Sequence, residues 1–174
     1  ISFVNYAKNY QFHKEEIDTA IHGCLSAGDL ILRQDVEIFE KRLAEYLGVQ
    51  YVVSVGSGTD ALSLSLKVAG IKFGDRIITT GHTFWATIEA IRHLKAIPLF
   101  VDITDNGTMD VEQIEHLLEH SLDKDKITAI IPVHIAGNVC EMDKIMELAN
   151  YYDIKVIEDS AQALGASLLK GLTA

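Results

Sequence analysis

The chain has 174 residues, of which 48% are hydrophobic and 23% charged, a composition that is typical of a globular protein and excludes an intrinsically disordered one. A formal net charge of −10 argues against a nucleic-acid partner, because phosphate backbones bind basic surfaces. No apolar run is long enough to span a membrane and no signal peptide is recognisable. We therefore expect a cytoplasmic protein with no membrane partner.

Helical patterns dominate the first part of the chain. Two stretches, 13–27 and 35–47, have the apolar spacing of helices, and Gly48 follows the second one as a helix C-cap. We assign residues 1–48 to an N-terminal helical segment.

Strand and helix patterns alternate from residue 49 onward. Short apolar runs rich in β-branched residues, typical of strands that are covered on both faces, occur at 51–55, 76–80, 97–101, 127–133 and 154–158. Helical patterns lie between them at 59–69, 84–95, 110–121 and 141–152. This alternation predicts an α/β domain over residues 49–174 with a mostly parallel sheet.

A glycine-rich turn follows the first of these strands. It reads Gly56-Ser57-Gly58-Thr59-Asp60, and its glycines would let the backbone approach an anion closely. Thr59 is placed to cap the next helix and to offer its hydroxyl and N–H groups to a phosphate. The alternative is a plain turn that only caps a helix.

A carboxylate follows the last strand. Asp159 lies at the edge of the sheet where ligands bind, and it would keep a pyridine nitrogen protonated in a poorly solvated place. The alternative is an aspartate that caps the following turn. Phe84 and Trp85 would offer a stacking face, or pack in the core. His82 and His134 also lie near strand ends, where structural histidines are more frequent than catalytic ones.

The two sites together indicate one flat, phosphorylated cofactor with a ring nitrogen. The carboxyl ends of parallel strands meet at one edge of a sheet, so the Thr59 turn and Asp159 are expected to face the same ligand. Pyridoxal 5′-phosphate (PLP) fits this description best, and no metal site is predicted.

Five segments, in order and at the right spacing, resemble the nucleotide-sugar aminotransferases of the DegT/StrS-like family, within the fold-type-I PLP enzymes. They begin with an early helix and its exit and end with a Glu-Asp-x-Ala-Gln signature. The segments are Phe39-Glu40 with Tyr46–Val49, Ser57–Leu62, Gly74–Thr79 with His82–Phe84, Pro132–Asn138, and Val156–Ala166.

The resemblance implies a three-layer α/β/α fold like that of aspartate aminotransferase, with residues 49–174 as an incomplete PLP-binding large domain. It also implies a homodimer that passes an amino group from an amino acid, glutamate, to a nucleotide-linked keto-sugar in polysaccharide or antibiotic sugar biosynthesis. The implied contacts are phosphate binding by the turn and the Asp60 amide, ring stacking, pairing with the ring nitrogen, and a hydrogen bond near the ring hydroxyl. The residues concerned are Gly58, Thr59 and Asp60, then Phe84, Asp159 and Gln162.

The lysine that would bind PLP covalently is not recognisable in this chain. Lys170 lies too soon after Asp159, so we predict no catalytic residue here and expect the N-terminal portion of a longer enzyme, inactive alone. The alternatives are a keto-sugar dehydratase, which has histidine in place of that lysine, and a truncated or non-catalytic relative. Arg33 stands where the family often has glycine, either solvated or facing the substrate.

Overall fold

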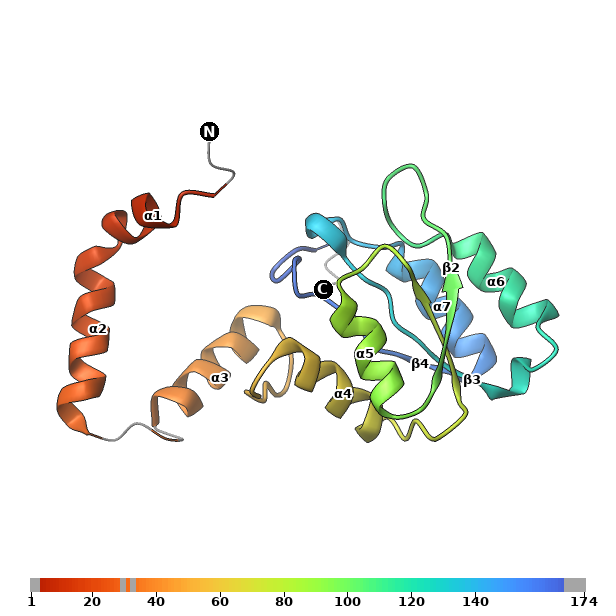
Figure 1. The fold of residues 1–174 in the computed structure, drawn as a ribbon, viewed down its shortest axis with the longest axis horizontal. Coiled ribbons are helices and arrows are strands. Elements are labelled where there is room, and N and C mark those ends of the chain that lie inside the picture. Colours follow the sequence, from red (N-terminus) through yellow and green to blue (C-terminus); the bar gives the residue numbers. More distant parts are fainter. Residues whose placement is uncertain (1–3, 29–30, 32–33, 168–174) are drawn as a thin grey trace. The chain divides into compact units, whose positions relative to one another are not determined.

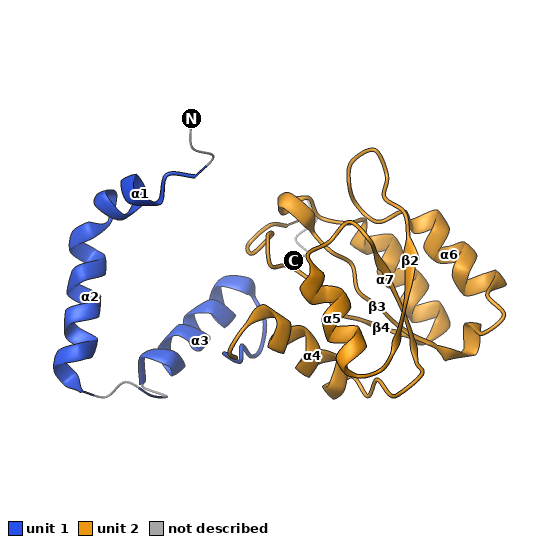
Figure 2. Ribbon diagram, viewed as in Figure 1, with its two compact units in different colours: residues 1–54 blue, residues 55–174 orange. Residues whose placement is uncertain are grey.

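The computed structural model describes residues 4–28, 31 and 34–167 of the chain. The chain divides into two compact units, residues 1–54 and 55–174 (Figure 2). The boundary between these units lies a few residues after the one predicted at 48. Arg33 and Lys170 lie outside the described residues.

The first unit is helical, as predicted, with one helix more than the pattern indicated. Its helices are α1 (Tyr6–Phe12), α2 (Lys14–Ala27) and α3 (Gln34–Leu47). Gly28 ends α2 in the left-handed conformation, with φ at 70°, which glycine adopts without steric cost. Among the described residues of α1, α2 and α3, only Ala44 is buried.

The second unit is a parallel α/β domain (Figure 1). Its four strands have the order β2-β1-β3-β4, and every neighbouring pair is parallel. In chain order the elements are α4 (Gly58–Val68), β1 (Arg76–Thr80), α5 (Trp85–His93), β2 (Ile97–Val101), α6 (Val111–His120), β3 (Ile127–Ile130), α7 (Met142–Tyr152) and β4 (Lys155–Val156). Single 3₁₀ turns lie at Lys124–Lys126 and Ile135–Gly137.

Two apolar cores lie on the two faces of this sheet. Successive strand residues point to opposite faces, so Ile77 packs with α4 and α5 while Ile78 packs with α6 and α7. Ile130 joins the α6–α7 core, and Ala129 and Ile131 join the other one. The described part of the domain is therefore a three-layer α/β/α structure, and the predicted fold class is confirmed.

The structure corrects the predicted strands in two respects. Residues 51–55 form no strand, because no described segment offers them a ladder of backbone hydrogen bonds; the N–H of Ser54 donates to Glu40 Oε1 at 2.6 Å instead. The runs 127–133 and 154–158 are longer than β3 and β4. The segments that follow β3 and β4 still lie side by side, since Val133 and Asp159 form an isolated parallel bridge.

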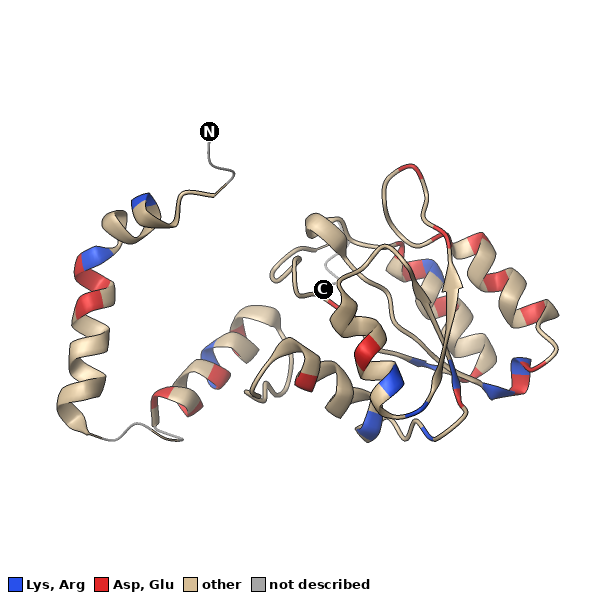
Figure 3. Ribbon diagram, viewed as in Figure 1, with Lys and Arg blue, Asp and Glu red and all other residues tan. Residues whose placement is uncertain are grey.

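Acidic side chains recur along α6 and α7 (Figure 3). The exposed carboxylates include Glu112, Glu115, Glu119 and Glu147. Such a surface repels the phosphates of nucleic acids, in line with the negative net charge. Among the described residues, no helix is long and apolar enough to cross a membrane.

We expect the sheet core to be sensitive to truncation of Ile130. This side chain is fully buried in the α6–α7 core, and Ile130→Ala should lower the free energy of unfolding by about 3 kcal/mol through lost burial and a new cavity. Chemical denaturation of the full chain measures the change. Leu122→Ala, at a fully exposed leucine, should stay within about 0.5 kcal/mol; equal losses would contradict the described core.

Candidate functional site

A pocket of about 320 Å³ lies where the segments that follow β1, β3 and β4 meet the N-terminus of α4. Its size is at the lower end for small-molecule sites. Five of the six residues predicted to bind a cofactor line it, namely Gly58, Thr59, Phe84, Asp159 and Gln162. The other lining residues are Leu62, Thr83, Ala86, Val133, His134, Ile135 and Ala161.

The N-terminus of α4 forms one wall. Ser57, rather than Thr59 as expected, is the N-cap, and its Oγ accepts the N–H of Asp60 at 3.1 Å. Ser suits this position because its short side chain reaches back to the first-turn amides. The N–H groups of Gly58 and Thr59 make no hydrogen bond to any residue that the structure describes, so they remain available to an anion.

Asp60 does not line the pocket. Its N–H is taken by Ser57 Oγ, and its carboxylate accepts the Ser57 hydroxyl at 2.9 Å. The Asp60 amide would have to leave Ser57 to bind a phosphate, so in this geometry the amides of Gly58 and Thr59 are better placed than the one predicted.

Asp159 also lines the pocket and is 9% exposed. Its backbone is fixed between the strand ends, since its N–H donates to Pro132 O at 2.9 Å and its carbonyl accepts the N–H of His134 at 3.1 Å. Oδ1 of the carboxylate accepts the Ala161 N–H at 3.3 Å. A buried carboxylate in a pocket attracts a cationic N–H group of a ligand.

The second carboxylate oxygen is bound by a residue that the sequence analysis missed. Thr87, fully buried in α5, donates its hydroxyl to Asp159 Oδ2 at 2.6 Å, and its own oxygen lies 2.8 Å from Thr83 Oγ1. The only sequence signal was a pair of threonines four residues apart, one helical turn, beside an aromatic residue.

Phe84 and Gln162 complete the pocket. Phe84 is the N-cap of α5 and is 75% exposed, which leaves its ring available for stacking. Gln162 Oε1 accepts the N–H of Ala136 at 2.7 Å, so the amide NH₂ group is the donor it can offer to a ligand. Trp85 and His82 are not among the lining residues.

His134 is fully buried and hydrogen-bonded through both ring nitrogens. Nδ1 faces the N–H of Cys140 at 3.2 Å, and Nε2 lies 3.0 Å from Glu158 Oε2. The network joins the segment after β3 to the residue before Asp159, which indicates a structural role for the histidine.

Opposing influences act on the protonation of this ring. Burial lowers the pKa of His134 because it disfavours the charged ring, whereas hydrogen bonds to anionic Cys140 and Glu158 side chains would raise it. The backbone N–H of Cys140 can only donate, however, so it requires a lone pair on Nδ1. In addition, the Cys140 thiol donates to Val133 O, so it is no anionic partner for the ring. The hydrogen bonds therefore support the neutral ring with its proton on Nε2, and we assign this tautomer.

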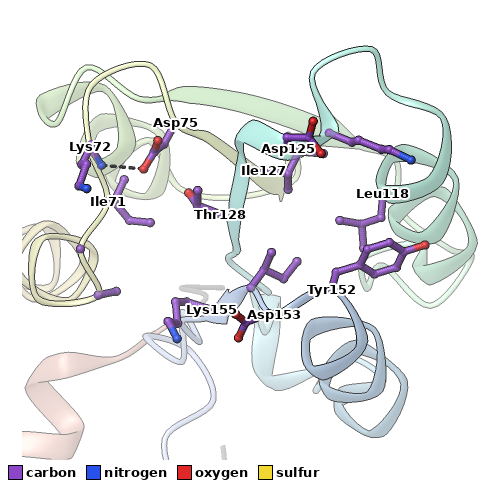
Figure 4. Close-up of a pocket in the computed structure, with 14 residues that line it drawn as sticks. Ile71, Lys72, Asp75, Leu118, Asp125, Ile127, Thr128, Tyr152, Asp153 and Lys155 are labelled. Carbon is purple, nitrogen blue, oxygen red and sulfur yellow. Dashed lines mark hydrogen bonds between the residues drawn. The ribbon is translucent and has the colours of Figure 1, made fainter.

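A larger hollow of about 720 Å³ lies at the amino ends of β1, β3 and β4 (Figure 4). Lysines and aspartates line it in equal number, Lys72, Lys124 and Lys155 with Asp75, Asp125 and Asp153. Ligands of open parallel sheets bind beyond the carboxyl ends of the strands, so the smaller pocket is the better candidate. Among the described residues, no cluster of His, Cys, Asp or Glu could hold a metal ion.

The model of the DegT/DnrJ/EryC1/StrS aminotransferase family matches residues 11–171. The chain belongs to this family. The chain is 38% identical to UDP-2-acetamido-2-deoxy-3-oxo-D-glucuronate aminotransferase of Pseudomonas aeruginosa, over 96% of this chain and 45% of that protein. The resemblance inferred from the sequence motifs is thereby confirmed.

Solved structures of family relatives share the fold. A DegT DnrJ EryC1 StrS aminotransferase from Brucella abortus superposes with a TM-score of 0.89 at 33% identity, over 94% of this chain and 45% of that one. NtdA from Bacillus subtilis, solved with bound cofactor PMP, gives 0.84 at 32% identity, over 92% and 36%. The chain spans less than half the length of each of these three relatives.

The tautomer assignment for His134 can be tested by NMR. At pH 7 the ¹⁵N shifts of this ring should be those of a neutral imidazole with one protonated and one unprotonated nitrogen, because Nδ1 accepts the Cys140 N–H. His134→Gln identifies the signals. A doubly protonated ring at pH 7 would show that the charge of Glu158 outweighs the backbone hydrogen bond.

Proposed function

We propose that this protein uses PLP to transfer an amino group from glutamate to a keto-sugar attached to a nucleotide. The observation that carries the proposal is the single pocket that joins the N-terminus of α4, Phe84 and the buried carboxylate of Asp159. Family membership supports the aminotransferase chemistry. The name of the Pseudomonas relative supports a nucleotide-linked 3-oxo sugar as the type of acceptor.

The pocket residues fit PLP from end to end. The first-turn amides of α4 and the Thr59 hydroxyl suit its phosphate, since helix N-termini bind anions. The exposed ring of Phe84 suits its pyridine face, and the buried carboxylate of Asp159 suits its protonated ring nitrogen. The NH₂ group of Gln162 is the donor for the ring hydroxyl.

When bound, PLP supplies an electron sink for the negative charge that develops beside the amino group. Asp159 keeps the ring nitrogen protonated, which the electron sink requires, and its burial excludes water that would weaken the ion pair. Phe84 orients the ring plane. None of the described residues that line the pocket is a lysine, so the residue that would bind PLP covalently is not among them.

We also propose that the protein acts as a homodimer in the cytoplasm, where nucleotide sugars and glutamate occur together. Supporting the dimer, α2 carries Ile17, Ile21 and Leu25 one turn apart on one side, and none of them is buried. A second copy would cover this stripe.

The dimer proposal predicts that Ile21→Glu weakens association of the full chain. A charge within the apolar stripe of α2 should move the light-scattering mass from dimer toward monomer. Thr19→Glu places the same charge on the other side of α2 and should leave the mass unchanged. A monomeric unmodified chain, or identical masses for both variants, would refute the proposed interface.

The proposed function predicts a large effect at Asp159. Asp159→Asn keeps the shape of the side chain but removes its charge, so transfer from glutamate to a nucleotide-linked keto-sugar should slow by about a hundredfold or more. Fixed-time assays of the full-length protein with PLP measure the aminated sugar. Asp105→Asn, at an exposed loop residue, is the matched control and should keep full activity. A full-length protein that binds no PLP, or an Asp159→Asn variant as active as the control, would rule the proposal out.

A further inference from the structure

Thr87 holds the carboxylate that faces the candidate cofactor, although it does not line the pocket itself. Its hydroxyl lies 2.6 Å from Asp159 Oδ2, and both residues are buried. Because an ionised carboxylate only accepts hydrogen bonds, the Thr87 proton must point to Asp159.

The direction of the remaining bond follows from this. The Thr87 hydroxyl uses its one proton in the hydrogen bond to Asp159, so Thr83 must be the donor in the 2.8 Å contact between the two hydroxyl oxygens. The result is a one-way chain from Thr83 through Thr87 to Asp159. Within such a chain each bond polarises the next, which strengthens the last bond to the carboxylate.

The two oxygens of Asp159 are consequently not equivalent. Oδ2 is bound by a short hydrogen bond from Thr87, whereas Oδ1 has only the 3.3 Å contact with the Ala161 N–H. The backbone of Asp159 is fixed by Pro132 and His134, so the Thr87 bond determines the remaining rotation of the carboxylate. Each oxygen keeps a further lone pair, and Oδ1, which accepts the longer hydrogen bond, is the better acceptor for a ligand N–H.

We infer that Thr87 is a positioning residue that orients Asp159 so that Oδ1 accepts the ring N–H of the cofactor, an inference that rests on the proposed function. Thr87 acts through Asp159 and touches no part of the ligand. It belongs to the first turn of α5, and its N–H donates to the carbonyl of Phe84 at 3.2 Å. One helical turn therefore fixes both the stacking ring and the carboxylate.

The test compares two non-covalent probes on the full chain, pyridoxamine 5′-phosphate (PMP) and its 1-deaza analogue, in which carbon replaces the ring nitrogen. Neither probe needs a covalent bond to a lysine. Thr87→Val replaces the hydroxyl by a methyl group of similar size. It should weaken the binding of PMP about tenfold or more, because a hydrogen bond to a charged group is lost. The deaza analogue should bind the variant and the unmodified chain within about twofold of each other, because it has no N–H for Asp159 to accept.

Two variants serve as controls. Thr79→Val removes a hydroxyl from an equally buried threonine, whose partner is the carbonyl of Ile131, and it should leave the affinity for PMP unchanged. Thr87→Ser keeps the hydroxyl and should restore PMP binding to within about threefold of the unmodified chain. Should Thr87→Val fail to fold, Thr87→Ala removes the same hydroxyl from a residue outside the pocket lining, and it should likewise weaken PMP binding about tenfold and leave binding of the deaza analogue within about twofold.

The two proposals fail in different ways. If the unmodified chain binds no PMP, the proposed function falls and the role of Thr87 falls with it. If it binds PMP and Thr87→Val weakens both probes equally, or weakens PMP no more than Thr79→Val does, only the inference on Thr87 is overturned.

Discussion

The burial of the Asp159 carboxylate is the constraint on which the pocket depends. A buried anion needs hydrogen-bond donors in place of water, and here they come from two parts of the chain. Thr87 donates from α5, 72 residues away in sequence, Ala161 from the following turn, and the backbone is held by the end of β3. Satisfying this one group brings α5 and the ends of β3 and β4 to the same place.

The sheet makes that convergence possible. Because all four described strands are parallel, the segments after β1, β3 and β4 leave the sheet at one edge. Alternating strand residues supply both cores, and this is why β1 and β2 could be predicted from apolar runs alone, with the bounds that the structure gives. Residues 51–55 have the same kind of pattern and form no strand, because pairing is a property of two segments and the pattern describes one.

The sequence allowed the grouping of the candidate residues to be predicted, but not their hydrogen bonds. The motif residues Gly58, Thr59, Phe84, Asp159 and Gln162 line one pocket, since each follows a strand or begins a helix at the same edge. The sequence does not reveal which atoms are already engaged. Ser57 Oγ accepts the N–H of Asp60, and the N–H of Ala136 donates to Gln162 Oε1. Thr87 was missed because its contact with Asp159 is long-range, and a threonine within a helix carries no local signal for such a bond.

The polarity of the pocket also sets the direction in which the proposed cofactor would bind. Among the described lining residues there is one carboxylate and no lysine or arginine, so positive potential comes from the N-termini of α4 and α5. The N-terminus of α4 also presents the amides of Gly58 and Thr59, which make no hydrogen bond to any described residue. A phosphate placed at the other end would meet Asp159, whose burial leaves little water to screen the repulsion. A ring N–H placed at α4 would meet backbone donors instead of an acceptor. Both mismatches disappear in a single orientation, with the phosphate at Gly58 and Thr59 and the ring nitrogen at Oδ1 of Asp159. The hydrogen bond from Thr87 to Oδ2 therefore matters for direction as well as affinity, because it determines which oxygen the ring meets.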